Sequence, residues 1–244
     1  MKRYIYDGSF EGLMTILYQS YYRGIPEWVC KENQATQGLI FEDEIINTDF
    51  EIYEKVCMKI GQKSSKHILQ QAYRAYLSEV EGVDLSIINY LREALKRGYQ
   101  IEHDLKNKHI LKVNQAARRV AFESMRFKGF VRFKDIEGYL VSKIEPDYDI
   151  LILIAEHFKE RLPNEKWVIV DSKRKKALVG YKKEVKIVDG LDENYFKYDE
   201  QDNGTYEKLW KMYFKEIAIE NRKNEKCQQG YMPKKYWKNL VEMR

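Results

Sequence analysis

Positive charge is concentrated in residues 105–134, which hold a single acidic residue, Glu123. The nine basic residues of this stretch are Lys106, Lys108, Lys112, Arg118, Arg119, Arg126, Lys128, Arg132 and Lys134. Clustered cations favour polyanions, because each phosphate that they neutralise releases condensed counterions. The formal net charge of the chain is only +5, so this local cluster is more informative than the total. The pattern indicates contact with a phosphate backbone.

An amphipathic helix over about residues 105–125 is expected to carry most of these cations. At roughly 100° per residue, its apolar face receives Ile110, Val113, Ala117, Val120 and Ala121. The opposite face receives, within about 40° of one another, Lys108, Lys112, Arg119 and Arg126. Solvated helix faces usually mix the two signs of charge, and this one does so only at Glu123. An ordinary solvated face is the alternative interpretation.

A β-hairpin is expected after the helix, because the period of the apolar residues changes from about 3.6 to 2. Its strands would be residues 130–133, with Lys134 following, and residues 139–144. Arg132 and Lys134 would share one face of the first strand and extend the basic surface, with Arg118 and Lys128 adding to it.

A second basic segment, near the carboxyl end, places aromatic residues among its lysines: Lys234, Lys235, Tyr236, Trp237 and Lys238. Cations for phosphates beside aromatic rings for stacking are typical of surfaces that contact single strands or flipped bases. The alternative is a docked terminal helix that buries Tyr236, Trp237 and Leu240 at the edge of a core.

Residues for catalysis are hard to find. Asp7 lies in a turn before a helix, His157 adjoins Glu156, and Asp171 follows an apolar strand, so these three are the candidates for acid–base chemistry. No His or Cys has the spacing of metal ligands, and neither GxGxxG nor GxxxxGK[ST] occurs. We therefore expect no metal site and no cofactor.

The composition bounds the class of protein. The chain has 244 residues, of which 44% are hydrophobic and 33% charged, which excludes collagen-like and wholly disordered proteins. The longest apolar run, residues 150–155, is too short to span a membrane. The three cysteines are far apart and odd in number, so a disulfide framework is not expected and the cytoplasm is the expected compartment.

The expected fold is α+β: a mostly antiparallel sheet of about five to seven strands, mainly in residues 127–188, flanked by helices. The first strand would be residues 4–6, and another would cover residues 39–46. The expected strands after the hairpin are residues 167–170, 177–181 and 185–188. Helices are expected at residues 10–22 after Ser9, 50–60 before Gly61, from Ser64 or Ser65 to about 79, 85–97 after Asp84, from Asp147 or Asp149 to 161, and 205–224. Residues 1–244 would form one domain, with a division into residues 1–125 and 126–244 as the alternative.

Several segments resemble a bacterial family of DNA metabolism proteins. They are YDGSFEGLMTILYQSY (6–21), ARRVAFESMRFKGFVRF (117–133), IEPDYDILILIAEHFKERLP (144–163), WVIVDSKRKKALVGY (167–181) and ENRKNEKCQQGYMPKKYWKNL (220–240). The resemblance implies a partner of a radical-SAM protein of DNA repair or modification. It also implies a link to uracil-DNA-glycosylase-like proteins, because longer relatives join a similar domain to one of that kind. It supplies no catalytic residues.

Two classes of function follow. The first is a DNA-binding accessory subunit, whose cations contact the backbone while a partner performs catalysis. The second is an enzyme that acts on DNA or on a nucleotide and brings Asp7, His157 and Asp171 together. A protein-interaction module is a third alternative.

Overall fold

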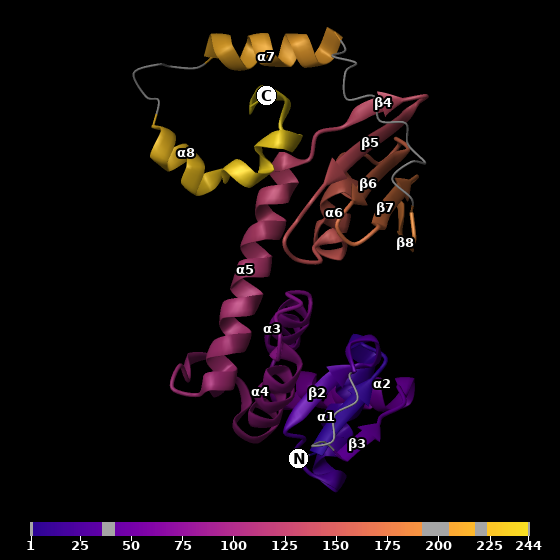
Figure 1. Ribbon diagram of the computed structural model, residues 1–244, viewed down its shortest axis with the longest axis vertical. Helices are drawn as coiled ribbons and strands as arrows, with labels where there is room; N and C mark the ends of the chain where they lie inside the picture. Colours follow the sequence, from indigo (N-terminus) through magenta and orange to yellow (C-terminus); the bar gives the residue numbers. More distant parts are fainter. Residues whose placement is uncertain (1, 36–41, 192–204, 218–223, 244) are drawn as a thin grey trace. The chain divides into compact units, whose positions relative to one another are not determined.

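The computed structural model describes residues 2–35, 42–191, 205–217 and 224–243 (Figure 1). The chain divides into two compact units, residues 1–121 and 122–244. One helix, α5 (Lys108–Phe130), contributes residues to both units. The single domain, with a division after residue 125 as its alternative, stays a prediction. Within the described ranges, no helix combines the length and the apolar character needed to cross a membrane.

The first unit contains a parallel sheet of three strands with β1 (Lys2–Tyr6) at its centre. Its neighbours are β2 (Trp28–Lys31) and β3 (Glu42–Ile45). The expected strand 39–46 is confirmed over β3, and its residues 39–41 lie outside the described ranges. Strand β2 is an addition to the strands expected from the sequence. Helix α1 (Phe10–Arg23) follows β1 as expected, because the Ser9 hydroxyl accepts a hydrogen bond from the Gly12 amide at 2.9 Å.

Three further helices complete the core of this unit: α2 (Phe50–Lys63), α3 (Lys66–Tyr76) and α4 (Val83–Arg97). Asp49 caps α2 and Ser65 caps α3, as expected. Two details of the prediction are wrong. Helix α2 was expected to end before Gly61, but it continues through this residue to Lys63. Apart from its chain neighbours and its own helix backbone, no described atom lies within 4 Å of the position that a Cβ of Gly61 would take. Helix α4 begins after Gly82, which has φ of 65°, and Asp84 lies inside the first turn, where it accepts a hydrogen bond from the Tyr6 hydroxyl.

The second unit contains a mixed sheet of five strands in sequence order: β4 (Lys134–Ile136), β5 (Tyr139–Ile144), β6 (Trp167–Asp171), β7 (Lys176–Tyr181) and β8 (Glu184–Asp189). The class α+β is confirmed, but a single, mostly antiparallel sheet is wrong. Strands β5 and β6 pair in parallel. They are connected by a crossover through α6 (Leu151–Arg161) and not by a hairpin. The parallel sheet of the first unit is a second departure.

The first hairpin is shifted along the chain relative to the prediction. Helix α5 runs to Phe130, residues 131–133 are irregular, and the strand begins only at Lys134. The expectation that Arg132 and Lys134 share one face of a strand is therefore wrong, because Arg132 lies before β4. The helix α6 begins after Ile150, so neither Asp147 nor Asp149 is its cap.

The carboxyl-terminal part of the second unit consists of short helices. Helix α7 spans Thr205–Ile217, and the rest of the helix expected to residue 224 falls largely on residues 218–223, outside the described ranges. Helix α8 (Glu225–Tyr231) is separate, capped by Asn224, and is followed by 3₁₀ turns at Lys234–Asn239 and Val241–Met243. The docked alternative is confirmed at Tyr236 and Leu240, which are buried, whereas Trp237 is only half-buried.

Gly180 on β7 tests the packing of the mixed sheet. A Cβ atom at this position would lie 2.1 Å from the ring of the buried Trp167 on β6. We expect Gly180→Ala to lower the free energy of unfolding by about 1–3 kcal/mol, measured by urea denaturation. The control is Gly129→Ala on the exposed side of α5, which has open space and should raise stability by roughly 0.5–1 kcal/mol. A Gly180→Ala protein as stable as the parent contradicts the described contact.

Candidate nucleic-acid interface

The first-unit part of α5, residues 108–121, separates apolar from cationic residues. Ile110, Val113, Ala117 and Val120 are completely buried, and the expected apolar face is confirmed at these positions. The same part contains no acidic residue, and its exposed cations are Lys108, Arg118 and Arg119. Lys112 is half-buried, because its ammonium group donates a hydrogen bond to the Glu81 carbonyl at 2.6 Å.

The second-unit part of α5 contains the one acidic residue of the helix, Glu123, which is only 4% exposed. Its two carboxylate oxygens accept hydrogen bonds from the backbone amides of Asp147 and Tyr148, both at 2.9 Å, and one accepts a third from the Tyr236 hydroxyl. Lys128 is exposed, and Arg126 donates to the Gly230 carbonyl at 2.9 Å. The surface of this part therefore carries positive charge with no exposed carboxylate of α5 beside it.

Arg132 is fixed inside the second unit. Its guanidinium forms an ion pair with Glu242 at 2.6 Å and lies 5.7 Å from the ring centre of Trp210. The Glu242 side chain is 3% exposed and also accepts a hydrogen bond from the Trp210 indole. Burial alone would raise the pKa of Glu242, but the hydrogen bond and charge of Arg132, together with hydrogen bonds from the backbone and from the Trp210 indole, outweigh it and hold this pKa below its ordinary value of 4.5. Lys134 is half-buried at the start of β4.

The carboxyl-terminal basic segment is held by contacts within the second unit. Lys235 pairs with Asp147 and Lys238 with Glu145. The Tyr236 ring is 4% exposed and packs edge-on against Phe127 with ring centres 5.0 Å apart. These contacts dock the segment onto the loop after β5 and onto the end of α5.

The aromatic residues of this segment also have local partners. The Trp237 indole donates to the Met232 carbonyl at 2.9 Å, and the exposed Lys234 lies 5.8 Å from the Trp237 ring centre. Burial, followed by the hydrogen bond to Glu123, raises the pKa of Tyr236 far above its ordinary range, so this hydroxyl acts as a donor. The three lysines of this segment, Lys234, Lys235 and Lys238, have exposed side chains, whereas Tyr236 is buried and Trp237 is half-buried.

Asp171, a catalytic candidate, organises the turn between β6 and β7. Its carboxylate is completely buried and accepts hydrogen bonds from the backbone amides of Lys173 and Arg174 and from the Arg174 guanidinium. Burial raises the pKa of Asp171, and the contacts with Arg174 oppose that shift. An aspartate with these partners is typical of a structural turn.

The other two candidates have different surroundings. His157 is half-buried beside Phe158, and burial, together with Lys128 and Arg161, lowers its pKa. His157 and Asp171 share no neighbour in their described contacts within the second unit. Asp7 belongs to the first unit, where it accepts hydrogen bonds from Ser9 and from the Thr48 hydroxyl at 2.7 Å. Burial opposes the effect, yet these bonds lower the pKa of Asp7.

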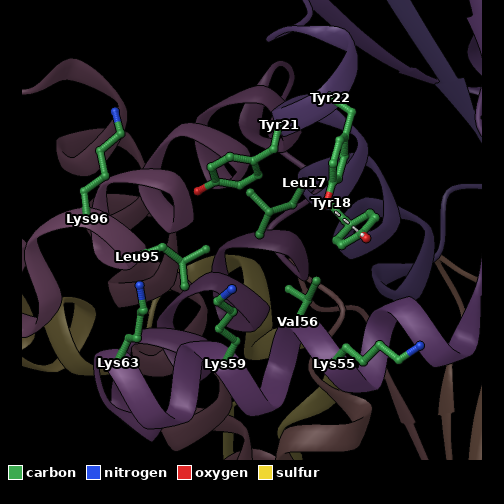
Figure 2. Close-up of a pocket in the computed structure, with 10 residues that line it drawn as sticks. All are labelled: Leu17, Tyr18, Tyr21, Tyr22, Lys55, Val56, Lys59, Lys63, Leu95 and Lys96. Carbon is green, nitrogen blue, oxygen red and sulfur yellow. Dashed lines mark hydrogen bonds between the residues drawn. The ribbon is translucent and has the colours of Figure 1, made fainter.

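The first unit also contains a pocket that the sequence did not predict (Figure 2). It has a volume of about 740 Å³ and lies between the second half of α1, the middle of α2 and the end of α4. Its walls consist of three tyrosines, four lysines and three aliphatic residues: Tyr18, Tyr21, Tyr22, Lys55, Lys59, Lys63, Lys96, Leu17, Val56 and Leu95. The signal in the sequence is the four-residue spacing of Lys55, Lys59 and Lys63, which repeats on one side of a helix.

Two contacts fix the aromatic side of the pocket. The Tyr22 hydroxyl donates to the Tyr18 hydroxyl at 3.3 Å, and this hydrogen bond raises the pKa of Tyr22. The Arg92 guanidinium lies 4.1 Å from the ring centre of Tyr21. Figure 2 shows Lys59 and Lys63 reaching from α2 toward the residues of α1 and α4. We call this site, with the ten residues named above, the Lys/Tyr pocket.

Comparison with known proteins gives a family and no function. Residues 81–242 match the model of DUF4130, a domain of unknown function, over more than half of the chain. The chain belongs to this family. No curated protein and no solved structure matches it. The matched region of this DUF4130 member contains α4, α5 and the second unit up to residue 242, and so all the α5 cations, but only Leu95 and Lys96 of the Lys/Tyr pocket. Among the described residues, no group of three or more His, Cys, Asp or Glu side chains is placed to hold a metal ion.

The Arg132–Glu242 pair gives a pH-dependent prediction. Arg132→Met leaves a buried carboxylate without its cation, so we expect the free energy of unfolding at pH 7 to fall by about 2–4 kcal/mol. The native pKa of Glu242 is depressed, so its contribution is present above about pH 4.5 and is lost as the pH falls through the native value. The difference between parent and variant should therefore shrink in acid, as followed by urea denaturation from pH 7 to pH 3.

The control for this experiment is Lys238→Met, which removes a more exposed ion pair and should cost less than about 1 kcal/mol. An Arg132→Met variant whose deficit is the same at pH 7 and pH 3 would show that the ion pair does not supply the stability.

Proposed function

We propose that this DUF4130 protein binds DNA and serves in DNA metabolism as the accessory partner of a radical-SAM or glycosylase-type enzyme. The observation that carries the proposal is the charge of α5: the helix holds six Lys and Arg residues, and its one carboxylate is buried. Cations that gather on a helix with no exposed acid of that helix beside them favour contact with phosphates.

The basic residues of α5 differ in how exposed their side chains are. Lys108, Arg118 and Arg119 are exposed in the first unit, as is Lys128 in the second. Arg132 forms an ion pair with Glu242 and is not part of the proposed surface. Such a surface contacts the backbone and reads no bases, so binding should depend strongly on salt and little on sequence.

The accessory role is supported by what the catalytic candidates do. Asp171 and Asp7 use their carboxylates to order turns, and His157 has neither of them as a neighbour in its described contacts. The reaction would then belong to the partner, as the resemblance to DNA metabolism proteins implies. A purified chain that alters DNA chemically by itself would overturn this part of the proposal.

The DNA-binding proposal is tested by reversing two exposed charges on α5, Lys108→Glu with Arg119→Glu. We expect the affinity for single- and double-stranded oligonucleotides, measured by fluorescence anisotropy, to fall roughly tenfold or more. The slope of log K against log salt should drop by about 2, because two phosphate contacts are lost.

The matched control is Lys183→Glu with Lys186→Glu, which reverses two exposed charges on the β7–β8 hairpin and should leave both quantities close to those of the parent. If the α5 variant keeps the parent affinity for both kinds of DNA, the proposed surface is refuted.

A further inference from the structure

The Lys/Tyr pocket has the size and composition of a site for a small organic anion. Its volume of about 740 Å³ falls within the range of ligand sites, which is roughly 300–1,000 Å³. Its ten lining residues include four cations and no acid. Ligand sites are usually lined by apolar and aromatic side chains with a few polar groups that converge, and Leu17, Val56 and Leu95 supply the apolar floor here.

The lysines of α2 make an unfavourable arrangement in this pocket. Lys55, Lys59 and Lys63 follow one another at four-residue intervals, and like charges at this spacing repel one another on a helix. Lys55 has Glu51 at 3.4 Å and Lys96 has Glu93 at 3.1 Å, both as exposed pairs within one helix. The positions of α2 three and four residues from Lys59 hold no acid. A bound anion between Lys59 and Lys63 would relieve this repulsion.

The tyrosines provide flat surface that an inorganic anion would not use. Tyr21 is 47% exposed and Tyr22 is 72% exposed, although both are large and half apolar. Neither ring is loose, because Arg92 stacks on Tyr21 and Tyr18 binds the hydroxyl of Tyr22. Ordered, exposed aromatic rings beside cations are the parts from which proteins build stacking sites for nucleobases.

We propose that the Lys/Tyr pocket binds a nucleotide, with the base stacked on Tyr21 or Tyr22 and the phosphate held by Lys59 and Lys63. This inference goes beyond the proposed DNA surface, because the pocket lies on α1, α2 and α4 and uses none of the α5 cations. The nucleotide can be free or can be an unpaired nucleotide of a DNA strand, and both present the same base and phosphate.

The experiment measures binding of dATP to the full chain by isothermal titration calorimetry, and binding of a 5′-phosphorylated oligothymidine by fluorescence anisotropy. Lys59→Gln with Lys63→Gln should weaken whichever probe binds by at least tenfold, because two charge-assisted contacts to phosphate are lost. Tyr22→Ala should weaken it by roughly five- to 150-fold, the value of one stacked base. The mostly exposed Tyr22 ring makes this variant safe for folding, and circular dichroism melting checks each protein.

Each outcome decides the inference. Binding of either probe with loss in both pocket variants supports it, and the probe that binds identifies the source of the nucleotide. It is overturned if neither probe binds, if both folded variants bind like the parent, or if pyrophosphate competes fully while Tyr22→Ala has no effect, which indicates a site for anions alone.

The α5 variant Lys108→Glu with Arg119→Glu separates this inference from the DNA-binding proposal. It should keep the parent affinity for dATP. If that variant loses duplex binding and neither it nor the parent binds a nucleotide, the DNA-binding proposal is supported and the proposal of a nucleotide site in the Lys/Tyr pocket is refuted.

Discussion

The buried carboxylate of Glu123 is the interaction on which the second unit depends. It takes three donors at once, two backbone amides from the loop after β5 and the hydroxyl of Tyr236. A carboxylate that is 4% exposed is tolerable only when its lone pairs are satisfied in this way. One side chain therefore ties together α5, the loop at Asp147–Tyr148 and the carboxyl-terminal turn. It also removes the single negative charge from the surface of α5.

Local signals in the sequence predicted the elements that local physics determines. The Ser9, Asp49 and Ser65 caps and the strands β6, β7 and β8 were found because capping and period-2 patterns depend on neighbours in the chain. The relative direction of β5 and β6 was predicted wrongly: they were expected to be antiparallel, and they are parallel. A helix was expected between them, and a helical crossover between neighbouring strands makes them parallel. The strand β2 escaped notice because its four residues, WVCK, carry no alternation.

The candidate site was predictable only in part, for the same reason. The periodicity of residues 108–121 predicted five buried positions on α5, of which Ile110, Val113, Ala117 and Val120 are buried and Ala121 is half-buried. No local pattern shows that Arg132 belongs to Glu242, 110 residues later, or that Lys235 belongs to Asp147. The Lys/Tyr pocket needed three helices to come together, and the lysine spacing of α2 gains meaning only beside the tyrosines of α1. The number of basic residues in a sequence segment thus overestimates the number that can contact DNA, because the fold pairs some of them with carboxylates.

The docking of residues 236–242 has a consequence for synthesis on the ribosome. Translation proceeds at roughly 5–20 residues per second, so seconds pass between the emergence of Arg132 and that of Glu242. During this interval α5 and the five-stranded sheet are already available, but the arginine lacks its carboxylate and Glu123 lacks its tyrosine. The nascent second unit must therefore wait, with part of its interior open to water, until Tyr236, Leu240 and Val241 arrive to cover it.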